Sequence, residues 1–367
     1  MARRRAAIEK LLGEHECAHL IFCGAARFGS AVQWLTQWPV TAEAVGVLTP
    51  GERDALFVQY VNHAPQARIL ADKADVDWGG ESGIKAALAV LEKRASSEQR
   101  VGYIGPLTAE QHAVLSARYP NVANLSRDYI RLRQVKSAEE LDWLRIGAHF
   151  SDLGMTALRA AIAPGISERE LGDRIERAYV ARGATNVIHY IGTTAMAAPD
   201  LGVPRQFPTT RRLQVGDVVV AEISAAFWDH PGQVLRSFAL GEPNKLYRDL
   251  HAAADATFDA IAKVLKAGAT PAQVIEASGV IEEAGFTIID DLLHGYGGGY
   301  LPPILGCKSR PAGPVPEMPF RAGQTVVIQP NVTTRDGKAG VQTGELVLIT
   351  ATGIERMHAM PRGFVTL

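Results

Sequence analysis

The alternation of apolar and polar residues divides the chain into two unequal parts. In the first part, short apolar runs alternate with segments of helical period. The runs predict strands at 19–23, 44–48, 55–61 and 101–104, and the helical spacing predicts helices at 6–14, 84–95 and 108–118. Strands and helices that alternate in this way predict a small open α/β sheet. A charged, unpatterned segment at 127–137 follows, so we place a domain boundary between 1–130 and 131–367.

The second part begins with two sequences that are typical of helix starts. Ser137-x-x-Glu140 and Ser167-x-x-Glu170 are capping boxes, and they predict one helix to about residue 163 and another to Gly183. Two stretches, 161–188 and 264–289, then share one plan of helix end, glycine, cap, amphipathic helix, glycine and apolar strand. This weak repeat predicts two αβ halves related by a pseudo-twofold axis, with a site between them. Further strands are predicted at 215–228, 325–329 and 341–350.

The stretch DDLLHGYGGGYLPP at 290–303 places a histidine beside a glycine-rich turn. His294 is followed by four glycines in five residues, with Tyr296 and Tyr300 among them. Glycine lets other atoms approach the backbone closely, so this pattern favours a histidine presented to a ligand at the end of a strand or in the next turn. A flexible loop around a structural histidine is the alternative. The stretch is not a phosphate loop, because no Lys-Ser/Thr follows it.

Composition narrows the class of protein. Apolar residues make up 47% and charged residues 21% of the chain, and the net charge is −1. These values are typical of a soluble globular protein and predict neither nucleic-acid nor membrane partners. The sequence shows no signal peptide and no long apolar segment. Its three cysteines give no disulfide framework, which predicts a cytoplasmic location.

Six segments of the second part occur in an order that is found in a known family. They are LRQVKSAEELDWLR, PGISERELGDRI, FPTTRRLQVGDVVVAEISAAFWDHPGQVLRSFALG, HGYGGG, VVIQPNV and GVQTGELVLIT. The order resembles that of the pita-bread hydrolases, which include Xaa-Pro dipeptidases, aminopeptidase P, methionine aminopeptidases and creatinase. The likeness covers 127–367, and the first 126 residues resemble the N-terminal domain of the creatinase and prolidase branch. It implies an α/β (α+β) fold with a small N-terminal α/β domain, a C-terminal pita-bread domain and a homodimer.

The sequence departs from this family at the residues that hold two divalent ions in its metallopeptidases. The family uses Asp, Asp, His, Glu and Glu, and the matching positions are Glu222, Gln233, His294, Gln329 and Gly344. A slip of one residue would bring Glu345 to the last position. Such ions are held by carboxylates and imidazoles, and three of these negative charges are missing. We therefore expect no bound metal pair and no other cofactor.

Two further histidines of the family are also replaced. Arg205, in RQFP, stands where relatives carry a histidine, and Leu301 stands where they carry a second one. Creatinase is a metal-free relative, but its two glutamates fall at Gln329 and about Leu235, so its substrate chemistry is not implied. Ectoine hydrolase, another metal-independent relative, resembles this chain in having a glutamate at the position of Glu222.

These positions predict a small-molecule site. Its expected members are the catalytic pair Glu222 and His294 and the substrate-binding residues Arg205, Gln233, Gln329, Trp228, Tyr296 and Tyr300. A carboxylate and an imidazole can act as base or nucleophile and as acid, and Arg205 can pair with a substrate carboxylate. Each residue also has a structural interpretation. Glu222 could form an ion pair with Arg236, and Arg205 could be a surface residue. Gln233 and Gln329 could be former ligands that only hydrogen-bond to backbone groups.

The leading hypothesis is a metal-independent hydrolase that cleaves a C–N bond in a small, carboxylate-bearing amide or amidine, or in a cyclic one. One alternative is an Xaa-Pro aminopeptidase or dipeptidase with an unusual metal site. Another is a catalytically inactive protein that binds a ligand or a protein in the cleft that forms the active site in its relatives. The retained Glu–His pair favours an enzyme, whereas the loss of both additional histidines favours the binding protein.

Overall fold

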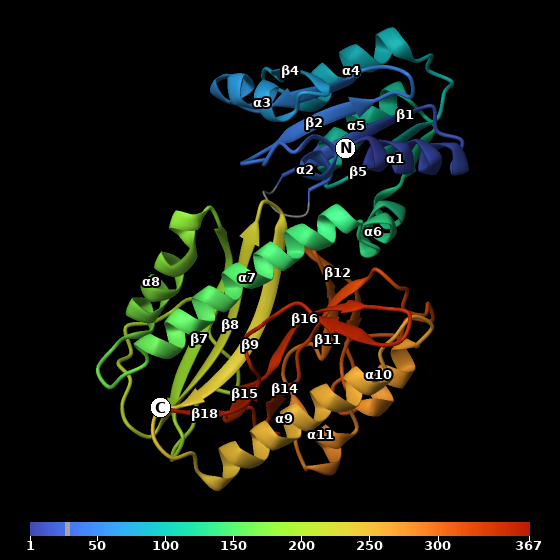
Figure 1. Ribbon diagram of the computed structural model, residues 1–367. Coiled ribbons are helices and arrows are strands. Elements are labelled where there is room, and N and C mark those ends of the chain that lie inside the picture. The colour runs from blue at the N-terminus through green and yellow to red at the C-terminus, as the bar shows by residue number, and fades with distance from the viewer. Residues whose placement is uncertain (26–29) are drawn as a thin grey trace. The chain divides into compact units, whose positions relative to one another are not determined.

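A computed structural model describes residues 1–25 and 30–367 (Figure 1). Its contacts divide the chain into two compact units, Met1–Arg133 and Gln134–Leu367. In the described ranges, no helix is both long and apolar enough to cross a membrane.

The first unit is built on a six-stranded mixed sheet with the order β4-β3-β2-β1-β5-β6. Its strands are β1 (His19–Gly24), β2 (Ala44–Leu48), β3 (Asp54–Val58), β4 (Ala74–Trp78), β5 (Val101–Ile104) and β6 (Val122–Asn124). Its helices are α1 (Ala2–Glu14), α2 (Ala31–Thr36), η1 (Val61–His63), α3 (Ala64–Leu70), α4 (Gly83–Arg94), α5 (Ala109–Arg118) and α6 (Ser126–Gln134). Side chains alternate along β1, so Leu20 and Phe22 pack into one core and Ile21 and Cys23 into another.

Two predictions for this unit were wrong. The segment at 127–137 is not irregular, because α6 occupies most of it and packs Tyr129 and Leu132, three residues apart, onto the core. The strand predicted at 55–61 ends at Val58, and η1 begins at Val61. The apolar residues at 58–61 therefore do not all belong to the sheet.

The second unit contains a nine-stranded sheet with the order β12-β11-β13-β16-β9-β8-β7, to which β17 and β18 add at β16 and β9. These strands are β7 (Thr185–Ala195), β8 (Asp217–Phe227), β9 (His230–Ala239), β11 (Leu293–Tyr296), β12 (Tyr300–Leu305), β13 (Thr325–Ile328), β16 (Gly344–Ile349), β17 (Ile354–Arg356) and β18 (Val365–Thr366). A smaller sheet holds β10 (Thr287–Ile288), β14 (Asn331–Thr333) and β15 (Gly340–Gln342).

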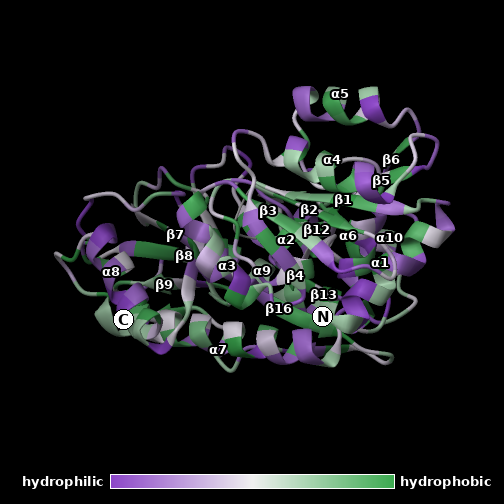
Figure 2. Cartoon of the chain, turned by 90° about the horizontal axis from the view of Figure 1, so that it is seen from above, coloured by the Kyte–Doolittle hydropathy of each residue, from purple (hydrophilic) through white to green (hydrophobic). Residues whose placement is uncertain are grey.

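The helices of the second unit follow the predicted repeat. They are α7 (Ala138–Ala161), α8 (Glu168–Tyr179) and η2 (Val180–Arg182) before the first strands, and α9 (Lys245–Val264), α10 (Pro271–Ala277) and α11 (Val280–Glu283) before the later ones. The capping boxes at Ser137 and Ser167 are confirmed. Helix α7 packs on β8 and β9, whereas α9 packs on β14 and β15 (Figure 1). Hydrophobic and hydrophilic residues are banded along α7 (Figure 2), as one buried face requires.

Strand register decides which side chains of this unit meet. In the β8–β9 pair, Glu222 lies opposite Leu235 and Ser224 lies opposite Gln233. Residues directly opposite share a face and neighbours along a strand alternate, so Glu222 and Gln233 project from the same side. Strand β16 adds Gly344 opposite Leu235, and therefore on that side as well.

Candidate functional site

Glu222 is a buried carboxyl group in the middle of β8, with 5% of its surface exposed. Its Oε1 accepts a hydrogen bond from Gln233 Nε2 at 2.7 Å, and its Oε2 accepts one from Gln342 Nε2 at 3.4 Å. The pKa of Glu222 is raised to about 8, mainly by burial and also by the charges of Asp290 and Asp291, while the bond from Gln342 opposes the rise. Removal from water disfavours the ionised form, so this carboxyl is mostly protonated at neutral pH.

A chain of two amides connects Glu222 to His294. Gln233 Nε2, besides its bond to Glu222, donates to Gln329 Oε1 at 3.1 Å, and His294 Nε2 lies 3.2 Å from the same oxygen. Gln329 follows directly on β13, and His294 lies in the neighbouring strand β11, opposite Val327. The four predicted residues therefore form one connected network, drawn together from β8, β9, β11 and the end of β13.

His294 is buried, contacts two tyrosine rings and has a polar neighbour at each ring nitrogen. It is 1% exposed, stacks on Tyr300 at 4.0 Å between ring centroids, and meets Tyr296 edge-on at 5.3 Å. Its Nδ1 lies 3.0 Å from Gly295 O. Burial lowers the pKa of His294 to about 4, against the opposing effect of its bonds to Gly295 and Gln329. The imidazole is thus neutral at neutral pH and can donate only one of its two hydrogen bonds.

The glycine-rich stretch forms the turn between β11 and β12. Gly297, Gly298 and Gly299 all have positive φ angles, of 118°, 65° and 105°. Because other residues rarely adopt such angles, this run of glycines is needed to bring Tyr300 back over the ring of His294. His294 is the second residue of β11 and does not follow the strand.

Tyr296 and Tyr300 join the site, whereas Arg205 and Trp228 do not. Tyr296 is buried and donates from its hydroxyl to Ser224 Oγ at 3.2 Å. Arg205 pairs with the buried Glu168 at 3.3 Å, and the described part of the chain shows no bond from it to Glu222 or His294. Trp228 lies in the β8–β9 turn, 43% exposed, and ~17–20 Å along the strand from Glu222.

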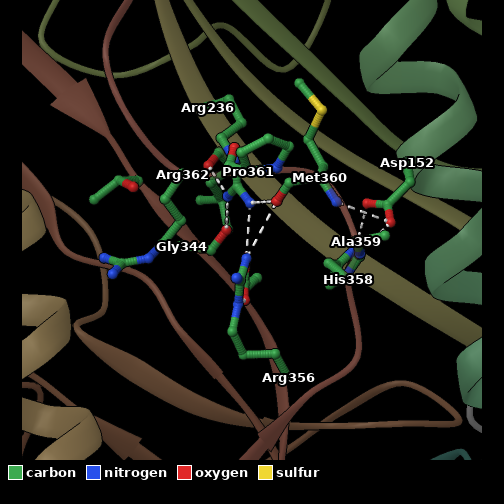
Figure 3. Close-up of polar contacts among 12 residues, drawn as sticks. Asp152, Arg236, Gly344, Arg356, His358, Ala359, Met360, Pro361 and Arg362 are labelled. Carbon is green, nitrogen blue, oxygen red and sulfur yellow. Dashed lines mark hydrogen bonds and ion pairs between the residues drawn. The ribbon is translucent and has the colours of Figure 1, made fainter.

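Glu345 faces away from the site and does not replace the missing carboxylate. It lies opposite Val234, one residue out of phase with Gln233, and pairs with Arg236 at 2.7 Å and with Arg356. The alternative of an ion pair between Glu222 and Arg236 is therefore wrong. Arg236 also donates to the carbonyls of Gly344 and Pro361, which ties β9, β16 and the C-terminal segment together (Figure 3).

Gly344, which the sequence resemblance matches to the fifth metal ligand, has no room for a side chain. A Cβ atom there would lie 2.3 Å from Ile328 O and 2.8 Å from Gln329 Cα, both on the adjacent strand or just after it. A larger residue would force β13 and β16 apart, beside the Gln329 that contacts His294. The absence of a carboxylate side chain at residue 344 therefore goes together with the close approach of β13 and β16.

Several residues of the network were not predicted from the sequence. They are Gln342, which contacts Glu222, Ser224, which contacts Tyr296, and Asn331, whose Nδ2 donates to Asp291 O at 3.2 Å. Strand alternation from Glu222 could have found Ser224. Gln342 and Asn331 lie on the smaller sheet, opposite each other, and no local pattern connects that sheet with β8.

The residues present do not fit a pair of divalent cations. The network offers one carboxyl group, one imidazole and the neutral amides of Gln233, Gln329 and Gln342. Within residues 1–25 and 30–367, no group of three or more His, Cys, Asp or Glu side chains is placed to hold a metal ion. Divalent ions in enzymes are bound mainly by such charged or imidazole ligands.

The whole chain is similar in fold to solved structures. It covers 99% of, and is 99% covered by, an X-Pro aminopeptidase from Thermotoga maritima, with a TM-score of 0.85 and 14% identity. For an Xaa-Pro dipeptidase from Bacillus anthracis the TM-score is 0.83, at 17% identity, with 100% of this chain and 99% of that one covered. The predicted fold, a small N-terminal α/β domain and a C-terminal pita-bread domain, is confirmed.

The family model of metallopeptidase family M24 matches residues 142–351, more than half of the chain. The chain belongs to this family. It is 24% identical over 235 residues to an Xaa-Pro dipeptidase of Pyrococcus furiosus, covering 63% of this chain and 65% of that protein. It is 27% identical over 251 residues to a probable dipeptidase PepE of Mycobacterium tuberculosis, covering 65% and 62%. The match thus spans just under two-thirds of the length of these relatives.

Proposed function

We propose that the chain hydrolyses a C–N bond in a small substrate. In this proposal no metal pair takes part, and Glu222 is the residue that accepts and donates the proton. Membership of a peptidase family and the names of the relatives support C–N hydrolysis. The observation that carries the proposal is the hydrogen-bonded network in which Gln233 Nε2 lies 2.7 Å from Glu222 and 3.1 Å from Gln329. It occupies the positions that match the metal ligands, and the amides of Gln233 and Gln342 donate hydrogen bonds to Glu222 there.

The raised pKa of Glu222, about 8, suits a group that both takes and gives a proton near neutral pH. In its ionised form Glu222 would remove a proton from the attacking water, and the resulting carboxylic acid would return it to the departing nitrogen. Water supplies the new C–O bond, and the C–N bond breaks as the nitrogen is protonated. One carboxyl group thus serves as base and then as acid.

His294 has a different role in this proposal from the acid that the sequence suggested. Its lowered pKa, about 4, leaves no proton on the second ring nitrogen at neutral pH. It acts instead as a positioning residue, since its Nε2 lies 3.2 Å from Gln329 Oε1 and Gln329 in turn holds Gln233. The stacked ring of Tyr300 keeps the imidazole in that orientation.

Two other candidates each have one supporting observation. Xaa-Pro dipeptidase or aminopeptidase activity is favoured by the names of the relatives and of the similar structures. A binding role without catalysis is favoured by the enclosure of Glu222 and His294, which are 5% and 1% exposed. We further propose that the protein is a cytoplasmic homodimer, and a monomeric mass in light scattering at micromolar concentration would contradict this.

Glu222→Gln tests the proposed function on a panel of amides, amidines and Xaa-Pro dipeptides. It keeps size and hydrogen bonding but removes the proton-transfer group, so kcat should fall by about 10²–10⁴. The matched control is Glu276→Gln, because Glu276 is an exposed glutamate of the same unit, paired with Lys308. Near-normal kcat in Glu222→Gln would refute the role of Glu222. If the wild-type protein turns over no member of the panel, this result favours the alternative in which the protein binds a ligand without catalysis.

A further inference from the structure

Three amide oxygens near Glu222 are buried without a hydrogen-bond partner. They are Gln233 Oε1, Asn331 Oδ1 and Gln342 Oε1, a statement that covers residues 1–25 and 30–367. The three residues are only 2%, 0% and 1% exposed. An unpaired polar atom at such depth is unfavourable, so each oxygen calls for a donor from water or a ligand.

For Gln233 and Asn331, the network itself dictates that the amide oxygen rather than the nitrogen is left without a partner. The carbonyl of Asp291 accepts from Gln329 Nε2 at 3.3 Å and from Asn331 Nδ2 at 3.2 Å, which fixes the orientation of both amides. Gln329 therefore directs its Oε1 toward Gln233, and Gln233 must donate a hydrogen bond to it from Nε2. The same nitrogen serves Glu222, so Gln233 Oε1 remains unpaired.

Two of the three residues bond to the carboxyl group of Glu222, and the third lies opposite one of them. Gln233 and Gln342 each donate to one oxygen of Glu222, and Asn331 lies opposite Gln342 in the β14–β15 pair. The exposed Asp290 and the half-buried Asp291 add negative charge, and Arg310 is a positive group that acts on Asp291. Arg236, on the neighbouring strand β9, is neutralised by Glu345 on the other side of the sheet. Acceptors and negative charge thus predominate around Glu222.

We propose that Gln233, Asn331, Gln342 and Glu222 bind a planar cation, an amidinium or guanidinium group of the substrate. The three amide oxygens are acceptors only, and so is Glu222 once the positive charge of the ligand has favoured its ionised form. Such a cation offers at least four N–H donors and a positive charge. A compact ammonium offers three donors and a urea offers no charge. This assignment of the substrate class rests on the proposed function, but the binding itself does not require turnover.

The test is calorimetric titration of the full-length protein with methylguanidinium chloride, methylammonium chloride and N-methylurea at constant ionic strength. Methylguanidinium should saturate one site per chain and bind about tenfold or more tighter than N-methylurea, with methylammonium between them. Asn331→Leu and Gln342→Leu should each weaken methylguanidinium binding by about fivefold or more. Melting temperatures of the variants show whether they remain folded.

Thr343→Val is the matched control. Thr343 is buried next to Gln342, but its hydroxyl bonds to Asp255 at 3.2 Å, outside the network. It should bind methylguanidinium as the wild type does. Equal binding of methylguanidinium and N-methylurea, no saturable binding, or wild-type affinity in folded Asn331→Leu and Gln342→Leu would overturn the inference, and water would then satisfy the oxygens.

The two proposals fail in different ways. Methylguanidinium binding as expected, with no hydrolysis of any panel member, would keep the cation site and remove the enzymatic role. Hydrolysis of neutral amides that depends on Glu222, without methylguanidinium binding, would keep the enzymatic role and remove the cation site.

Discussion

Gln233 donates a hydrogen bond to Glu222 Oε1 at 2.7 Å from the same nitrogen that reaches Gln329. The two residues come from neighbouring strands, β8 and β9, and the sequence resemblance matches them to the first two metal-ligand positions of the family. An uncharged amide here satisfies the carboxyl group by hydrogen bonds alone. The pKa of Glu222 is high because burial disfavours the ionised form and the charges of Asp290 and Asp291 oppose it.

Restoring carboxylates should restore metal affinity. The double variant Gln233→Asp, Gln329→Glu would set three carboxylates and His294 around one point, which is a common ligand set for one transition-metal ion. We expect it to bind one Mn²⁺ or Zn²⁺ per chain, measured by titration and by elemental analysis after dialysis. The wild-type protein is the control, and stoichiometric binding to both proteins would show that the amides do not decide metal affinity.

Gly344→Ala should destabilise the protein, because its Cβ would lie 2.3 Å from Ile328 O. Overpacking of this kind typically costs about 1–3 kcal/mol. The free energy of unfolding in urea measures the effect. Gly353→Ala is the control, since its Cβ would have nothing within 4 Å, and it should change stability little. Equal stability of the two variants would contradict the close approach of β13 and β16.

The stability contributed by Glu222 should depend on pH. Its pKa is raised from 4.5 to about 8 on folding, so the contribution is complete below pH 4.5 and is lost as the pH rises to about 8. Across this window the wild-type protein should lose about 1.4 kcal/mol per pH unit relative to Glu222→Gln. Urea unfolding of both proteins at pH 5, 6.5 and 8 measures this difference, and parallel stability curves would contradict a buried, protonated Glu222.

Local patterns in the sequence predicted the elements of the second unit better than the contacts between them. The capping boxes at Ser137 and Ser167 fix helix starts through bonds within three residues, so they can be recognised in the sequence. The resemblance placed Glu222, Gln233, His294 and Gln329 together, and the structure connects them. It also placed Arg205 at the site, but the longer reach of arginine lets it pair with the buried Glu168 instead.

Other parts of the site depend on distances that no local pattern encodes. Gln342 reaches Glu222 across 120 positions of the chain, and Asn331 enters only because β14 pairs with β15. The strand predicted at 341–350 is in fact two strands, β15 and β16, divided at Thr343. This break puts Gln342 and Gly344 in different sheets, and it directs Glu345 to Arg236.

We propose C–N hydrolysis that depends on Glu222 and requires no bound metal pair. The decisive experiment is to measure kcat on the best panel substrate before and after treatment with a chelator, with elemental analysis of the same sample. We expect unchanged kcat and far less than one metal ion per chain. One or two tightly bound ions per chain, with activity abolished by the chelator and restored by adding the metal, would contradict it.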